Sequence, residues 1–219
     1  MKIIEQRFHI DHFEPEEDIR RITRAARICY KSKDLTTHES RCRFVDRLKK
    51  RNPENPHMSP FEHSSLSVIF ITNRGVSHEM VRHRLMSPNQ ESSRYCCYDR
   101  ESFGNELTFI RDSAISDEGP AYLEWLNECA GVEKNYFRRL DWGYGTDTAR
   151  NALTNDVKTE LIITTNYREW RHILKLRCSK EAHYQMREAM LPVLIYLKKE
   201  LPCVFDDIPY WNGEEVAYD

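Results

Sequence analysis

Two runs rich in β-branched residues are the clear strand candidates in this sequence, residues 64–73 (SSLSVIFITN) and residues 158–166 (KTELIITTN). Elsewhere the apolar residues follow helical spacing, which limits the chain to a small sheet packed by long helices. The helices are predicted over residues 14–30, 37–50, 74–86, 118–145, 147–153, 167–178 and 180–201. We therefore predict an α/β (α+β) fold with a small mixed or antiparallel sheet, as one domain over residues 1–219 with an acidic, irregular tail at about residues 206–219.

Prolines and capping residues indicate where these elements begin and end. Pro15 and Thr37 stand at the starts of the first two predicted helices, where proline and threonine are favoured. Residues 52–60 (NPENPHMSP) contain three prolines and are predicted as a loop. Pro88 should stop a helix from continuing, so the segment around it is also predicted as a loop.

Composition excludes several classes of function. The 219 residues include 31% charged residues, and no apolar run approaches the length of a membrane span. The net charge is −2, so no overall positive field attracts nucleic acid. The N-terminal residues MKIIEQRFHIDHFEPEED become acidic at once, unlike a signal or transit peptide, and we expect a cytoplasmic protein.

The cysteines and glycines argue against disulfide bonds, a structural zinc site and a glycine-rich phosphate-binding loop. Seven cysteines at irregular spacing, without a CxxC pair, are typical of reduced thiols rather than of a disulfide framework or a structural zinc site. The seven glycines form neither a GxGxxG nor a GxxxxGK[ST] motif. Any nucleotide phosphate must therefore be held by side chains, chiefly arginines.

The stretch RHRLMSPNQESSRY, residues 82–95, has the composition of an anion site. It contains three arginines and a single acid, whereas a solvated helix surface would mix lysines and glutamates. Its small polar side chains can add neutral hydrogen bonds to a phosphate or to a pyrimidine edge. We favour an anion site over ordinary surface charge, with the candidate residues Arg82, Arg84, Ser87, Asn89, Ser92, Ser93 and Arg94.

The histidines near this stretch leave alternatives open. His83 lies between two arginines, so we predict that it stays neutral, as a hydrogen-bond partner or a stacking ring. A packed polar core residue is equally compatible with the local sequence. His57 and His63 accompany Glu62, but their spacing matches no zinc motif, so no metal is predicted and a ligand-pocket role for His57 is favoured.

A known signature occurs in the same stretch: R-H-R, two residues, S, one residue, N, two residues, S, one residue, then R-Y. All eight of its fixed positions agree, namely Arg82, His83, Arg84, Ser87, Asn89, Ser92, Arg94 and Tyr95. In this the sequence resembles the flavin-dependent thymidylate synthases. The resemblance extends to HMSPFEH (residues 57–63), to Ala149–Arg150 and to NYREWRHILKLR (residues 166–177), and it covers about residues 20–205.

The resemblance implies a complete reaction. Such enzymes convert dUMP to dTMP, with methylenetetrahydrofolate as carbon donor, NADPH as reductant and FAD as hydride carrier. It also implies a homotetramer in which several subunits build each active site. The implied partners are small molecules and further copies of the chain, and neither nucleic acid nor a membrane.

Residue roles are implied by the matched positions. Arg177 would be the catalytic residue, because a guanidinium facing the uracil ring favours its N3-deprotonated, activated form. Arg94 and Arg150 would hold the dianionic phosphate. The implied cofactor contacts are His57, Ser59, Arg82, His83, Arg84, Gln90, Asn166, Tyr167, Arg168 and His172, with His57 near the flavin ring and the folate. The implied dUMP contacts are Glu79, Arg82, Gln90, Glu91, Ser92, Ser93, Arg94, Arg150 and Arg177.

Three positions depart from the family pattern. Gln90, His172 and Glu79 stand where glutamate, asparagine and glutamine are familiar. Gln90 changes the charge beside the nucleotide, and a carboxylate at Glu79 would repel a phosphate unless a residue such as Arg82 offsets it.

Other functions compete with this interpretation. A nucleotide- or flavin-binding protein on the same scaffold, without catalysis, is the main alternative. A single-stranded nucleic-acid binder is disfavoured by the net charge and by the few interleaved aromatic residues. Cys96 and Cys97 lie near Arg94, which could activate a nucleophile, but this family does not need an enzyme cysteine, so we predict that both are dispensable for chemistry.

Overall fold

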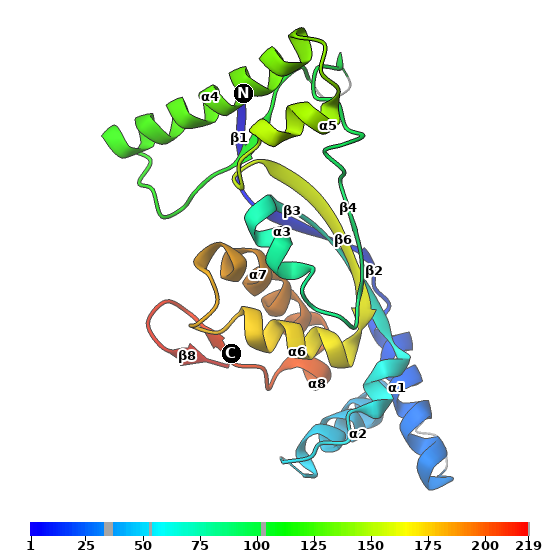
Figure 1. Cartoon of the computed structure of the whole chain (residues 1–219). Coiled ribbons are helices and arrows are strands. Elements are labelled where there is room, and N and C mark those ends of the chain that lie inside the picture. The colour runs from blue at the N-terminus through cyan, green and yellow to red at the C-terminus, as the bar shows by residue number, and fades with distance from the viewer. Residues whose placement is uncertain (33–36, 53, 102–103, 219) are drawn as a thin grey trace. The chain divides into compact units, whose positions relative to one another are not determined.

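The computed structural model describes residues 1–32, 37–52, 54–101 and 104–218 (Figure 1). The chain divides into two compact units. The first comprises Met1–Arg7, Phe70–Arg82 and Asn89–Ile162, and the second comprises Phe8–Ile69, His83–Pro88 and Ile163–Asp219. The two predicted strand runs form β3 (Ser65–Asn73) and β6 (Lys158–Asn166), and each contributes residues to both units.

A four-stranded sheet carries the residues of interest at its ends. Its strand order is β2-β3-β6-β4, so β2 (Arg7–His12) and β4 (Ser87–Gln90) are the edge strands. Alternate residues of β3 and β6 are buried, as expected for strands with a packed face. Pro88 lies within β4, so the predicted loop was wrong here: an edge strand tolerates a residue without an N–H donor.

The first unit is built around the long helix α4 (Pro120–Asp141). Strand β1 (Lys2–Ile4) pairs in parallel with β5 (Thr108–Ile110). The core of this unit consists of Tyr98, Leu107, Phe109, Trp125, Cys129, Tyr136, Ala149 and Val157. The remaining elements are α3 (Arg74–Met80), α5 (Thr146–Ala149) and a short 3-10 helix, η3 (Arg150–Ala152).

The second unit is mainly helical. Helix α1 (Pro15–Tyr30) packs against α2 (His38–Lys50) and against the 3-10 helix η1 (Ser59–His63). Helix α6 (Tyr167–Arg177) packs against η1 and against α7 (Tyr184–Glu200), with α6 in yellow beside α7 in orange in Figure 1. Helix α8 (Pro202–Phe205) and the antiparallel pair β7 (Tyr210–Trp211) and β8 (Val216–Ala217) end the chain.

The predicted fold class is confirmed, and most predicted helices occur at the expected places. Pro15 is the first residue of α1, and the Thr37 side chain accepts a hydrogen bond from the Ser40 N–H at 3.2 Å. The tail is not wholly irregular, because it forms the β7–β8 hairpin, and the predicted proline-rich loop ends in η1. Pro53 of that loop and Asp219 of the tail lie outside the described residues. In the part of the chain that the structure describes, no helix combines the length and apolar character needed to cross a membrane.

Candidate active site

Asparagine caps start two helices that carry predicted site residues, α3 in the first unit and α6 in the second. The Asn73 side chain at the end of β3 accepts a hydrogen bond from the Val76 N–H at 2.7 Å, which starts α3. The Asn166 side chain at the end of β6 accepts from the Glu169 N–H at 2.9 Å, which starts α6. Asparagine is among the best residues at this position because its side-chain oxygen satisfies an N–H that the helix leaves unpaired. The arginine-rich stretch follows α3, and Arg177 ends α6.

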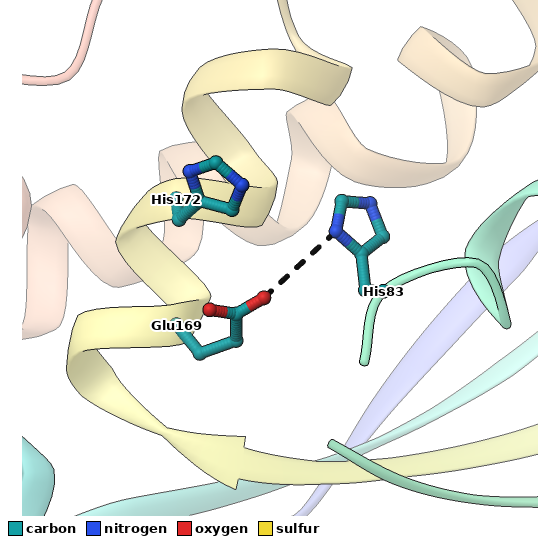
Figure 2. Close-up of side chains that lie close together, drawn as sticks. All are labelled: His83, Glu169 and His172. Carbon is teal, nitrogen blue, oxygen red and sulfur yellow. Dashed lines mark ion pairs between the residues drawn. The ribbon is translucent and has the colours of Figure 1, made fainter. Parts of the chain in front are cut away.

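In the second unit, the His83 ring faces Glu169 and His172 of α6 (Figure 2). The Arg177 Nε–H donates a hydrogen bond to His83 Nε2 at 3.0 Å. On the other side of the ring, His83 Nδ1 lies 3.9 Å from Glu169 Oε1. The His172 ring meets the His83 ring edge to face, with centroids 6.1 Å apart. Two predicted cofactor contacts and the predicted catalytic arginine are therefore brought together.

The surroundings of His83 keep it neutral. Burial, then the positive charge of Arg177, then His172 lower the pKa of His83 to about 4. Since Nε2 accepts the hydrogen bond from Arg177, the ring proton is on Nδ1, facing the carboxylate of Glu169. The carboxylate of Glu169 would stabilise a protonated His83 ring, but burial and the adjacent Arg177 guanidinium outweigh this effect and lower the pKa of His83. This agrees with the neutral His83 predicted from the sequence.

His83, Glu169 and His172 are also the residue types of a metal site. Their ligand atoms all lie within 4.8 Å of one another. A tetrahedral zinc ion with bonds of about 2.1 Å needs donor atoms about 3.4 Å apart, so these side chains would have to draw together. The Arg177 guanidinium on His83 would also oppose a cation. The arrangement suits hydrogen bonding to an organic ligand better than coordination of a metal.

Other predicted cofactor residues of the second unit surround the start of α6. Arg168 is exposed and forms an ion pair with Glu62 of η1 at 2.5 Å. Tyr167 is completely buried and its hydroxyl donates to Asp18 Oδ2 at 2.6 Å, so its side chain belongs to the core and only its main chain could face a ligand. The remaining predicted contacts here are half-buried His57 and the exposed residues Ser59 and Arg84.

In the first unit, Gln90 is fixed by two hydrogen bonds. Its amide nitrogen donates to Ser77 Oγ at 2.8 Å and to Thr159 Oγ1 at 3.1 Å. These bonds use both amide hydrogens and leave the Oε1 oxygen as the polar atom that could meet a ligand. An ionised glutamate could only accept from these two hydroxyls, and the Ser77 hydroxyl already donates to the Arg74 carbonyl at 3.0 Å, so a glutamate could not make both bonds. The glutamine at this position is thus matched to its hydroxyl neighbours.

The Glu91 carboxylate has an internal role. It accepts hydrogen bonds from Tyr98 Oη at 2.7 Å, from Lys158 Nζ at 3.1 Å and from the Glu160 N–H at 3.1 Å. Burial and the charge of Glu91 raise the pKa of Tyr98 well above its usual value, so the phenol remains a donor. The carboxylate therefore anchors the predicted nucleotide-binding segment to β6.

The predicted phosphate ligands lie on two connected segments of the first unit. The Ser92 carbonyl accepts from the Tyr95 N–H at 3.0 Å and from the Cys96 N–H at 2.9 Å, which closes a turn. Arg94 in this turn is exposed, and its carbonyl accepts a hydrogen bond from Thr146 Oγ1 at the start of α5. Exposed Arg150 follows α5 directly. Of the other predicted nucleotide contacts in this unit, Ser93 is buried, Glu79 half-buried and Arg82 exposed.

The sequence did not identify Glu169, Lys158 or Tyr98 as members of these networks, nor Ser77 and Thr159, the partners of Gln90. A signal existed for Glu169, which stands three residues before His172 and so lies on the same face of a helix. Lys158 and Glu160 alternate along a strand and share a face, but nothing local indicates that Glu91 lies between Lys158 and Tyr98.

The two adjacent cysteines are poor candidates for a nucleophile. Burial raises the pKa values of the Cys96 and Cys97 thiols, which disfavours the reactive thiolate. The Cys97 thiol also donates to Asp99 Oδ1 at 2.6 Å. Both observations support the prediction that neither thiol takes part in the chemistry.

Comparison with known proteins gives a consistent result. Residues 10–203 match the family model described as thymidylate synthase complementing protein. A protein named flavin-dependent thymidylate synthase from Geobacter sulfurreducens is 29% identical over 190 residues, which are 84% of this chain and 78% of the relative. The enzyme of the same name from Mycobacteroides abscessus is 30% identical over 215 residues, 88% of this chain and 82% of the relative. That from Pyrococcus furiosus is 32% identical over 144 residues, 65% of this chain and 58% of the relative. The chain belongs to the flavin-dependent thymidylate synthase family.

Proposed function

We propose that this protein converts dUMP to dTMP by reductive methylation, with FAD, with methylenetetrahydrofolate as carbon donor and with NADPH as reductant. Family membership supports the reaction. The observation that carries the proposal at the level of residues is the 3.0 Å hydrogen bond by which Arg177 is fixed on neutral His83. This hydrogen bond orients the Arg177 guanidinium beside the His83 ring, which is neutral and therefore does not repel the guanidinium.

Arg177 is proposed to activate the pyrimidine. Carbon C5 of uracil must become electron-rich before it can attack a one-carbon unit, and loss of the N3 proton supplies that density. A guanidinium beside the ring stabilises the resulting negative charge more strongly in a partly buried site than in water. Because Arg177 is half-buried and anchored through Nε, little reorganisation is needed when the charge develops.

Arg94 and Arg150 are proposed to bind the nucleotide phosphate. Both are exposed arginines on segments joined by the hydrogen bond from Thr146 to the Arg94 carbonyl. A guanidinium matches two phosphate oxygens at once, so two of them can neutralise a dianion. Gln90 and Glu91 would act on the same segment by fixing its path against β6.

The residues around α6 fit an anionic dinucleotide cofactor. The N-terminus of this helix offers N–H groups, and Arg84, Arg168 and His172 are exposed donors in the same unit. FAD, when bound, supplies the redox chemistry, and the protein supplies binding, orientation and electrostatics. His83 would orient the cofactor as a neutral ring, and His57 would lie near the flavin and the folate.

We further propose that the protein works in the cytoplasm as a homotetramer with active sites shared between subunits. The family resemblance supports this assembly.

The proposed function is tested by spectroscopy and by product analysis. We expect the purified protein to bind FAD, to change its flavin spectrum when dUMP is added, and to form dTMP only when dUMP, the folate and NADPH are all present. Flavin and dUMP binding without dTMP would instead support a binding protein without catalysis. Arg94→Ala should weaken dUMP binding about tenfold or more, since a charged hydrogen bond to phosphate is lost. Arg43→Ala is the matched control, because Arg43 is exposed and pairs with Glu39 on α2.

A further inference from the structure

A basic surface on α1 and α2 contains none of the residues assigned above to the proposed reaction. It contains two hollows in the second unit, of about 580 Å³ and about 550 Å³. Arg20, Arg24, Arg27 and Lys31 supply the charges of the first hollow. Arg27, Arg47, Lys50 and Arg51 supply those of the second, so Arg27 is common to both. We call these two adjoining hollows the α1–α2 groove.

The groove concentrates positive charge on a chain that is nearly neutral overall. Its lining includes no acid, whereas the whole chain has a net charge of −2. Arg20 pairs with Glu17 at 2.7 Å, and Lys50 pairs with Asp46 at 2.8 Å. Among the residues that the structure describes, none of the ion pairs involves Arg24, Lys31 or Arg47. The groove therefore presents a local positive potential that attracts anions.

The guanidinium groups of the groove are partly pre-arranged. Arg27 and Arg47 both lie over the ring of Phe44, with 4.6 Å and 5.9 Å from each Cζ atom to the ring centroid. Cation–π contacts of this kind hold two like charges near one another. Because the arginines are already ordered, less conformational entropy is lost when they bind a ligand. The planar guanidinium groups suit carboxylates, which accept two parallel hydrogen bonds.

The groove begins beside a residue of the proposed site. Helix α2 ends at Lys50, and the chain then leads to His57, whose N–H donates to the Leu48 carbonyl at 3.1 Å. Leu48 itself lines the second hollow. In Figure 1, α1 and α2 lie next to one another, and the two helices pack together. A ligand held near His57 could therefore extend along α2 into the groove.

We infer that the α1–α2 groove binds the glutamate end of the folate cosubstrate, including further γ-linked glutamates; this inference rests on the proposed function. The ligand class is a flexible chain with one carboxylate per added unit, which matches cations spaced along two helices. A single-stranded nucleic acid fits less well. It needs exposed aromatic faces for its bases, and the groove's aromatic residue, Phe44, is already covered by Arg27.

The experiment compares Arg24→Gln and Arg47→Gln with the control Arg43→Gln. Arg43 lies on α2, does not line the groove and pairs with Glu39 at 2.8 Å. Binding of a γ-linked pentaglutamate peptide is measured by calorimetry, and KM is measured for monoglutamyl and pentaglutamyl methylenetetrahydrofolate. We expect the pentaglutamyl form to have the lower KM. Each groove variant should weaken peptide binding and raise that KM about two- to threefold, the usual effect of one exposed ion pair, with kcat unchanged.

The outcomes separate the inference from the proposed function. If dTMP forms but both folates have the same KM, or if Arg43→Gln weakens binding as much as the groove variants do, the groove is not the folate site. Tighter binding of a single-stranded oligonucleotide than of the peptide would also overturn the inference. If neither folate yields dTMP, the proposed function itself fails. Peptide affinity that falls as salt is raised would support the ionic contacts.

Discussion

At the scale of single residues, the protonation of His83 connects stability to pH. The pKa of His83 is lowered from 6.5 to about 4 in the folded protein. Between pH 4 and pH 6.5 the His83 ring is therefore protonated in the unfolded chain but neutral in the folded chain. The contribution of His83 to the free energy of unfolding should therefore be fully present above pH 6.5 and should be lost as the pH is lowered towards 4. The contribution of His83 is at most about 3 kcal/mol, and less where water screens the ring. Urea unfolding at a series of pH values measures it.

The matched variants for this prediction are His83→Gln and His9→Gln. His83→Gln should remove part of the pH dependence, because glutamine does not titrate. His9 is exposed on β2, so His9→Gln is the control for replacing a histidine at a solvated position. Identical curves for the wild type and His83→Gln would show that His83 titrates normally in the folded state.

Replacing Arg177 should affect catalysis more than cofactor content. Arg177→Ala removes the charge that would stabilise deprotonated uracil, and a loss of about 10²-fold or more in kcat is expected for an electrostatic contact of this kind. It also removes one cause of the lowered pKa of His83, which should rise. Turnover, the ratio of flavin to protein absorbance and an NMR titration of His83 measure the three effects. Equal loss of flavin and turnover would make Arg177 a cofactor or folding residue.

At the scale of elements, the two asparagine caps separate stability from cofactor binding. Asn73→Ala and Asn166→Ala should each lower the free energy of unfolding by about 1 kcal/mol, because each leaves a helix N–H unpaired. Only Asn166 is proposed to contact FAD, so only its replacement should also reduce flavin content. Asn166→Asp keeps the cap but places a negative charge near the cofactor phosphates, so it should retain stability and lose flavin. Denaturant unfolding and flavin absorbance distinguish these results.

The elements differ in how far the sequence predicts them. Helices α1, α4 and α7 follow from local apolar spacing, and β3 and β6 from runs of β-branched residues. The short strands β1 and β5 were not predicted, because each is defined by its partner: Lys2 pairs with Thr108, far away in the sequence. The strand around Pro88 was missed for the same reason, since its pairing with β6 outweighs the local preference for a loop.

In the candidate site, too, features set by local sequence could be predicted, whereas contacts between distant residues could not. The arginine-rich signature could be found from spacing, and so could the chemistry of its members. The partners that fix them could not, because Glu91 meets Lys158, and His83 meets Arg177, across long stretches of sequence. Glu91 illustrates the difference. The resemblance implies a nucleotide contact for this residue, and no local pattern predicts that its carboxylate accepts hydrogen bonds from Tyr98, Lys158 and the Glu160 N–H.

At the scale of the whole molecule, the proposed assembly has a consequence that a mixture of two impaired variants can test. Arg94 and Arg177 are both required by the proposed mechanism, and they belong to different compact units of the chain. If one subunit supplies Arg94 and another supplies Arg177 to the same active site, mixed tetramers of Arg94→Ala and Arg177→Ala contain some sites with both arginines. Random mixing in equal amounts should restore about one quarter of the sites, since each intact arginine is present with a probability of about one half. If a single subunit supplied both arginines, every site would lack one of them, and mixing would restore no activity. Turnover after unfolding and refolding the variants together, with each variant refolded alone as the control, decides between these arrangements.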